Sequence, residues 1–341
     1  MAAASLPEGV LSSDEKSCSP VASSSGGCRA TASKSDSDSD DDVVFISETR
    51  KPISILYGPR STSELDLIRR CCTDKYKGKP VQQRSTRSST KFNDTDYLGK
   101  AWFGKTADRA EIVETLSNCG WAGADSDLSC LLSDTAWLND EVMNSIMCVV
   151  AKHSSTKIGV FSSFFYTKLS NIFEESGDKS PGLKSGLDLM CRWVHPKKSK
   201  LQGSSVVLIN HHMCHWSFVH VETKPVDESG VWRTGTRPRL SYYDSYNGKN
   251  NICLDRLEKF FQHFGEIRGC PELTGSWHKR NVYPPQVPAQ TDSWNCGLFV
   301  LAAVDCLAAN SIPNGYGSSS MPAFRKELAM LFSEAGLGKN I

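Results

Sequence analysis

A nearly continuous apolar run from Gly297 to Ala309 constrains the fold of this 341-residue chain more than any other segment. The run is apolar on nearly every face and long enough for a helix, so we expect a helix that is buried on all sides. Cys296 would then stand at the amino-terminal end of this helix. Unpaired backbone N–H groups and the positive end of the helix dipole favour a thiolate over a thiol at that position.

Gln290 lies six residues before this cysteine, in Gln290-Thr-Asp-Ser-Trp-Asn-Cys296-Gly297. Its side-chain amide can fold back beside the backbone N–H of Cys296, and two such donors would form an oxyanion hole for acyl transfer. A structural cysteine at the start of a core helix is the alternative, and this segment alone does not exclude it.

Two upstream strands carry the partners that a cysteine nucleophile needs. His215 opens the β-rich stretch 215–222, and Asp244 ends a second stretch, 239–244, which runs into a turn. If the two strands pair as a hairpin, the imidazole and the carboxylate become neighbours. We expect Asp244 to bind Nδ1–H of the ring and Nε2 to face Cys296.

Each of these residues has a simpler explanation when it is taken alone. A single histidine is more often structural, and an aspartate before a turn is more often a turn former. The joint occurrence of His215, Asp244, Gln290 and Cys296, each on an element that suits its role, favours a catalytic site.

The order of these residues and their surrounding motifs resemble the Ulp/sentrin-specific cysteine proteases, which process SUMO and related modifiers. The shared motifs are His-Trp at 215–216, Tyr-Tyr-Asp-Ser at 242–245 and Gln-x-Asp-x-x-Asn-Cys-Gly at 290–297, with two more blocks at 137–140 and 160–169. The resemblance spans roughly 137–309. It implies an α+β domain of the Ulp/adenain type, in which helices flank a mixed central sheet.

Two features depart from the family pattern. A polar insert at 223–237 separates the two strands and looks like an enlarged hairpin. The bulky Trp294 stands two residues before Cys296, where a smaller or polar residue would be expected.

The resemblance implies cleavage after the carboxyl-terminal Gly-Gly of a ubiquitin-like modifier, with SUMO favoured, through a thioester on the cysteine. Trp137 and Trp216 would close a tunnel that admits only glycines, although ordinary core packing would also explain them. Asp140 would contact a basic residue of the modifier or cap the helix that follows.

Three alternatives stay open. The chain could act on another ubiquitin-like modifier or on ubiquitin, and the catalytic residues do not separate these substrates. An acetyltransferase built on the same fold is disfavoured, because acetyl transfer has no use for a Gly-Gly tunnel. An inactive SUMO-binding scaffold is disfavoured by the four competent catalytic residues.

Composition restricts the partners and the compartment. A formal net charge of +1 points to neither nucleic acid nor a membrane as a partner, and we expect a monomer. Thirteen cysteines, without a Cys-x-x-Cys pair or a secretory leader, fit the reducing nucleus or cytoplasm. The chemistry needs no cofactor, and the cluster at 211–215 does not have a common zinc spacing, so we expect no metal.

Residues 1–95 are polar and have few apolar clusters, so we expect a disordered tail before a catalytic domain at 96–341. One apolar island follows the acidic stretch 35–42 and consists of Val43, Val44, Phe45 and Ile46. Such a run suits strand addition to a basic-rimmed sheet edge and resembles a SUMO-interacting motif. A chance apolar patch is the alternative.

Apolar periodicity predicts the remaining elements. We expect a helix at 141–150 that Asn139 or Asp140 caps, a strand at 205–209 and a helix around 254–264. Pro322 would open a last helix that ends before Gly336.

Overall fold

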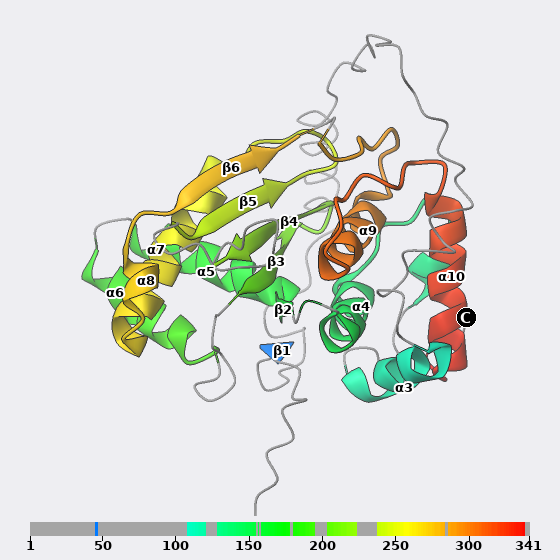
Figure 1. The fold of residues 1–341 in the computed structure, drawn as a ribbon, viewed down its shortest axis with the longest axis horizontal. Coiled ribbons are helices and arrows are strands. Elements are labelled where there is room, and N and C mark those ends of the chain that lie inside the picture. The colour runs from blue at the N-terminus through cyan, green and yellow to red at the C-terminus, as the bar shows by residue number, and fades with distance from the viewer. Residues whose placement is uncertain are drawn as a thin grey trace, which may run out of the picture. The chain divides into compact units, whose positions relative to one another are not determined.

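The computed structural model describes residues 108–120, 128–154, 156, 158–177, 180–194, 203–223, 237–283 and 286–337, together with the backbone of residues 45–46. A mixed sheet of strand order β1-β2-β3-β4-β5-β6 lies at the centre of this part of the chain (Figure 1). The strands are β1 Phe45–Ile46, β2 Gly159–Phe161, β3 Ser204–His211, β4 His215–Glu222, β5 Arg239–Tyr243 and β6 His278–Val282.

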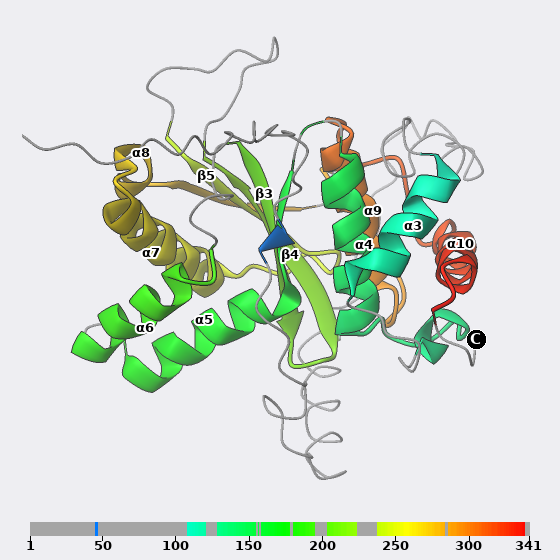
Figure 2. The same ribbon diagram turned by 90° about the horizontal axis from the view of Figure 1, so that it is seen from below.

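Helices cover both faces of the sheet (Figure 2). On one face, α4 and α9 pack against the strands and α3 and α10 lie outside them, while α5, α6, α7 and α8 cover the other. The helices are α3 Arg109–Cys119, α4 Asp140–His153, α5 Ser163–Ser176, α6 Pro181–Cys191, α7 Asn251–Arg268, α8 Pro271–Thr274, α9 Cys296–Ala308 and α10 Met321–Glu334, and the short 3-10 helix η3 is Ser129–Leu131. The expected α+β fold, with a mixed sheet flanked by helices, is confirmed.

Strand β3 shows why the sheet is buried on both faces. Successive side chains of a strand point to opposite faces. Val206 and Leu208 therefore enter the core formed with α4 and α9, and Val207 and Ile209 enter the core formed with α5 and α7. The apolar run predicts a strand here, and β3 extends it slightly at both ends.

The sheet register brings two catalytic candidates together. β4 is antiparallel to both β3 and β5, and Phe218 of β4 lies opposite Tyr243 of β5. The first residue of β4, His215, therefore lies near the chain that leaves β5 at Asp244. The hairpin expected from the sequence is confirmed, although residues 224–236 of its insert lie outside the described ranges.

The helices confirm most of the expected elements. Asn139 is the N-cap of α4 and accepts a hydrogen bond from the backbone N–H of Val142 at 3.0 Å, while Asp140 is the first helical residue. In α9 every residue except Leu307 is buried, as its composition predicts. β6 is a finding of the structure, because most of its side chains are exposed and no apolar pattern marks it.

Candidate active site

Cys296 is the first residue of α9, and its side chain is 1% exposed. The next residue must be small for steric reasons, because a Cβ on Gly297 would lie 3.1 Å from Cβ of Leu138. This close approach brings the start of α9 against the segment that carries Trp137. The expected position of the cysteine, at the amino-terminal end of a buried helix, is confirmed.

His215 and Asp244 form a buried pair. Nε2 of the ring lies 2.9 Å from Oδ1 of the carboxylate, and the side chains are 2% and 1% exposed. The expected pairing is correct but the expected ring orientation is wrong, because Nε2 and not Nδ1 binds Asp244. Nδ1 is therefore the ring nitrogen that remains for the interaction with Cys296. Residue order cannot reveal which edge of the imidazole faces the carboxylate, because that depends on how the strand start is packed.

The electrostatics of the pair follow from burial and mutual attraction. Burial alone would lower the pKa of His215, but hydrogen bonds with Asp244 and Cys296 raise it to about 10. Burial would raise the pKa of the Asp244 carboxyl, and the hydrogen bond and charge of His215 outweigh that effect and lower it. Both groups are therefore held in their charged forms at neutral pH.

Further contacts fix the Asp244 carboxylate. Its Oδ1 also accepts from the backbone N–H of Tyr246 at 2.8 Å, and its Oδ2 accepts from the hydroxyl of Tyr242 at 3.4 Å. A Cβ on Gly248 would lie 2.2 Å from Oδ2, so the turn packs directly against the carboxylate. The sequence marks 247–248 as a turn but gives no sign of this contact.

Gln290 is joined to the same turn. Its backbone N–H donates to Ser245 O at 2.9 Å, and its Oε1 accepts from the Ser245 hydroxyl at 2.8 Å. Its Nε2 donates to the backbone oxygen of Asp292 at 2.9 Å and to Oδ1 of Asp292 at 3.0 Å. The candidate oxyanion donor is thus tied both to the chain beyond Asp244 and to the loop before Cys296.

Sequence reasoning missed the part that Asp292 plays in this loop. Its Oδ1 accepts from the backbone N–H groups of Trp294 and Asn295 at 3.0 and 2.8 Å, and its Oδ2 accepts from Nδ2 of Asn295 at 3.0 Å. An aspartate that binds backbone N–H groups two and three residues ahead is a recognisable turn signal, so the sequence offered a hint. The carboxylate shapes the loop that delivers the cysteine to α9.

The two tryptophans lie in different environments. Trp216 is buried, and its indole N–H donates to Leu138 O at 2.8 Å. Trp137 is partly exposed, and its indole N–H donates to Ser293 O at 2.6 Å. Both therefore tie the 137–138 segment to the elements that carry His215 and Cys296, and their part in a substrate tunnel stays a prediction.

Asp140 contacts the strand that leads to His215. Nδ2 of Asn210 donates to Oδ2 of Asp140 at 3.2 Å, and Oδ1 of Asn210 accepts from the backbone N–H of Met213 at 2.8 Å. Burial raises the pKa of Asp140. Its contacts link α4 to the β3–β4 turn, and its contact with a modifier stays a prediction.

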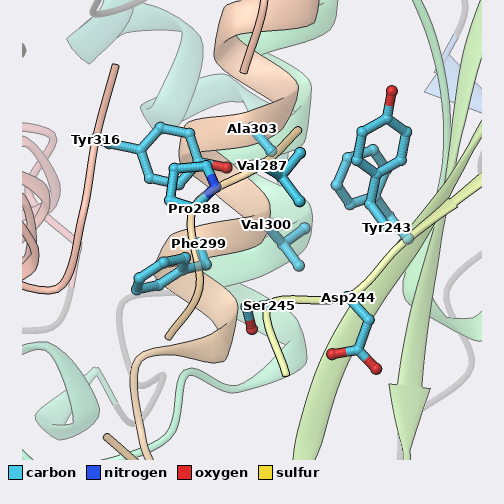
Figure 3. A pocket seen from close by; sticks show the side chains of 10 residues that line it. Tyr243, Asp244, Ser245, Val287, Pro288, Phe299, Val300, Ala303 and Tyr316 are labelled. Carbon is cyan, nitrogen blue, oxygen red and sulfur yellow. The ribbon is translucent and has the colours of Figure 1, made fainter. Parts of the chain in front are cut away.

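A small cavity of about 20 Å³ lies beside Asp244 (Figure 3). Its volume could hold about one water molecule, and its walls are mostly apolar. It is too small to take a peptide tail. The lining residues are Phe218, Tyr243, Asp244, Ser245, Val287, Pro288, Phe299, Val300, Ala303 and Tyr316.

The remaining sequence predictions meet the structure in part. Phe45 and Ile46 form β1, which pairs in parallel with Val160 and Phe161 of β2, while Val43, Val44 and the expected boundary near residue 95 lie outside the described residues.

Of the helices within the described ranges, none is both long and apolar enough to span a lipid bilayer. In the same ranges, no three side chains of His, Cys, Asp or Glu gather in a way that could hold a metal ion.

Comparison with known proteins decides the family. Residues 136–339 match the Ulp1 protease family, C-terminal catalytic domain. The chain belongs to this family. The resemblance inferred from the sequence motifs is therefore confirmed, and all four catalytic candidates lie within the matched Ulp1 family domain.

Relatives within the Ulp1 family are distant in sequence. Human sentrin-specific protease 5 is 26% identical over 205 residues, which are 60% of this chain and 23% of that protein. Human sentrin-specific protease 2 is 26% identical over 203 residues, 58% of this chain and 30% of that protein. The chain thus spans less than a third of the length of these relatives. A crystal structure of the C-terminal Ulp1 protease domain in complex with Smt3, the yeast ortholog of SUMO, aligns with a TM-score of 0.46 at 18% identity, covering 67% of this chain and 95% of that one.

Proposed function

We propose that this chain is a cysteine peptidase that cleaves after the carboxyl-terminal Gly-Gly of a ubiquitin-like modifier, with SUMO as the favoured substrate. The observation that carries the proposal is the buried His215–Asp244 pair, which interacts with Cys296 at the start of α9. Membership of the Ulp1 protease family supports it. The names of the sentrin-specific relatives favour SUMO over ubiquitin and other modifiers.

We propose that, at the start of the first half of the reaction, the proton of the Cys296 thiol already lies on His215, whose ring is held as an imidazolium, so that the attacking group is a thiolate. The thiolate attacks the carbonyl carbon of the terminal glycine, and the negative charge passes to the carbonyl oxygen. As the C–N bond breaks, the imidazolium gives its proton to the leaving amine, and a thioester remains on the enzyme. Asp244 stabilises the charged ring throughout this half.

In the second half, His215 takes a proton from a water molecule whose oxygen attacks the thioester. The thiolate leaves and the modifier is released with a free carboxylate. The backbone N–H of Cys296 and Nε2 of Gln290 stabilise the oxyanion in both halves. An amide NH₂ carries two hydrogens, and Nε2 of Gln290 donates to two oxygens of Asp292, so we propose that one of these two bonds is exchanged for a bond to the oxyanion during the reaction.

The two tryptophans supply the proposed selectivity. Trp216 binds the carbonyl of Leu138, the residue after Trp137, and a narrow passage between the two indoles would admit glycine while it excludes larger side chains. Asp140 is proposed to contact a basic residue of the modifier. We further propose that the enzyme is a monomer of the nucleus or cytoplasm and that it needs no cofactor. Its tail before residue 96 is proposed to bind SUMO.

Covalent trapping tests this function. The purified chain is incubated with vinyl-sulfone probes made from SUMO, from other ubiquitin-like modifiers and from ubiquitin, and adducts are identified by mass spectrometry. The expected result is a SUMO adduct on Cys296 that is absent from Cys296→Ser, which is nearly isosteric but lacks the strong nucleophile. An adduct on another cysteine would refute the catalytic site. An adduct with a different modifier would refute SUMO as the substrate, and transfer of an acetyl group without any adduct would support the acetyltransferase alternative.

A further inference from the structure

Arg325 of α10 is buried in an unusual way for an arginine. Its side chain is 2% exposed, and it is the largest by volume among the most deeply buried side chains of the described residues. Nη1 donates to Cys130 O at 2.5 Å, and Nη2 donates to Ala136 O at 2.8 Å and to Oδ1 of Asn295 at 3.0 Å. The guanidinium therefore joins three separate segments.

A buried charge is a costly way to fill this space. All three of these acceptors are uncharged oxygens, so the bonds offset the loss of hydration only in part. An apolar side chain of similar volume would often be as stabilising as a buried charge in such a place. The planar fork of an arginine is, however, able to hold several acceptors at fixed distances from one another. The presence of an arginine here indicates that the positions of these three acceptors relative to one another must be fixed.

One arm of this network reaches the oxyanion donor. Arg325 holds Oδ1 of Asn295, and Nδ2 of Asn295 donates to Oδ2 of Asp292 at 3.0 Å. The other oxygen of Asp292 accepts from Nε2 of Gln290 at 3.0 Å. An unbroken series of hydrogen bonds thus leads from α10 to the amide of Gln290 through the two residues that shape the nucleophile loop.

The second arm reaches the proposed substrate passage. Arg325 binds the carbonyl of Ala136, the residue before Trp137, and the indole of Trp137 donates to Ser293 O at 2.6 Å. The same guanidinium therefore fixes both the loop before Cys296 and the 136–137 segment, which is bonded to that loop through Trp137. Because both are attached to one rigid group, their separation cannot change without the loss of a buried hydrogen bond.

We propose that Arg325 is a positioning residue, which acts through Asn295 and Asp292 to aim the Gln290 amide at the oxyanion and to set the distance between Trp137 and the nucleophile loop. It does not touch the reacting atoms. The kinetic part of this proposal rests on the proposed peptidase function.

Kinetics of a fluorogenic SUMO substrate test the first consequence. Arg325→Met is expected to lower kcat by about 10- to 100-fold with little change in KM, because a small displacement of an oxyanion donor acts on the transition state. The kcat of Arg325→Lys should lie between those of the wild type and Arg325→Met, because an ammonium keeps the charge but lacks the planar guanidinium that binds several acceptors at once. A loss that appears in KM alone would overturn the proposal.

Asn295→Ala breaks the same link from the other side and leaves the bonds to Cys130 and Ala136 in place. The Asn295 side chain makes no capping bond to α9, so this variant also serves if Arg325→Met folds poorly. The double variant should lose no more activity than the more impaired single variant. Losses that multiply would show that the two residues act independently and would overturn the proposal.

Leu328→Ala is the matched control, because Leu328 lies on the same helix, is fully buried and packs in the apolar core. It should lower the Tm and leave kcat of the folded enzyme unchanged. If Arg325→Met behaves in the same way, its role is structural and the proposal fails.

A readout without turnover separates this inference from the function. In protein labelled with ¹⁵N at glutamine side chains, the NH₂ resonances of Gln290 should shift in Arg325→Met and Asn295→Ala, and stay in place in Leu328→Ala. Unchanged resonances in the first two variants would refute positioning. If the wild type cleaves and traps no modifier, the proposed function fails, and these resonances still decide the role of Arg325.

Discussion

Replacing Gly248 with alanine would press a methyl group against the carboxylate that orients His215. The φ angle of Gly248 is outside the left-handed region, so the backbone accepts an alanine without strain. The new Cβ would lie 2.2 Å from Oδ2 and 3.1 Å from Cγ of Asp244. The perturbation therefore acts on one side chain and leaves the turn itself intact.

The size of the effect follows from these distances. To reach an ordinary contact, Oδ2 must retreat by roughly 1.2 Å. Because the carboxylate is rigid, a shift of this size also moves Oδ1 and breaks or bends its 2.9 Å bond to His215. A displacement of about 1 Å in a catalytic group can cost up to about 100-fold in rate, so we expect kcat/KM to fall by about 10- to 100-fold, or about 1.4 to 2.7 kcal/mol in transition-state stabilisation.

The assay compares Gly248→Ala with Gly275→Ala on a fluorogenic Gly-Gly-terminated SUMO substrate. A Cβ on Gly275 meets no atom within 4 Å, and its φ is −75°, so this control introduces the same substitution without the contact. Both variants should unfold at temperatures close to that of the wild type. If Gly248→Ala keeps the wild-type kcat/KM, then the position of the Asp244 carboxylate does not govern His215 and the reasoning is wrong.

Three further predictions follow from the site and the tail. Asp244→Asn should move the alkaline limb of the pH–rate profile to lower pH, because the carboxylate helps to raise the pKa of His215 to about 10 and its loss lets the imidazolium lose its proton earlier; an unmoved limb would argue that a different group controls it. Gln290→Ala should lower kcat by about 10²- to 10³-fold with KM nearly unchanged, as steady-state kinetics would show; a loss in KM alone would indicate a role in substrate binding. A peptide that covers residues 35–48 should shift the resonances of one strand–helix groove of labelled SUMO, and Val44→Ala with Ile46→Ala should abolish the shifts. Absence of shifts at millimolar peptide would leave this island as a chance apolar patch.

The sequence alone determined the features that depend on local pattern. A helix that is apolar on all sides can only be buried, so the position of Cys296 at its start follows from residues 296–309. Two β-rich stretches joined by a polar insert predict a hairpin, and antiparallel pairing of these strands places His215 beside Asp244. The order of the motifs then identified the family.

Only the tertiary structure decided how the side chains meet. Which nitrogen of His215 binds Asp244 depends on the packing of the β4 start, and the contact of Gly248 with that carboxylate depends on how the turn folds back. The parallel pairing of β6 with β5 joins segments separated by a whole helix, and its exposed residues carry no periodic signal.

Arg325 is the clearest example of a residue whose contacts the sequence does not reveal. Its neighbours in sequence make it one more cation on an amphipathic helix, which would normally face water. Its burial beside Ala136 and Asn295 depends on long-range packing of α10 against segments about 190 and 30 residues away. Local patterns specify elements and their faces, whereas contacts between distant elements arise only when the whole core assembles.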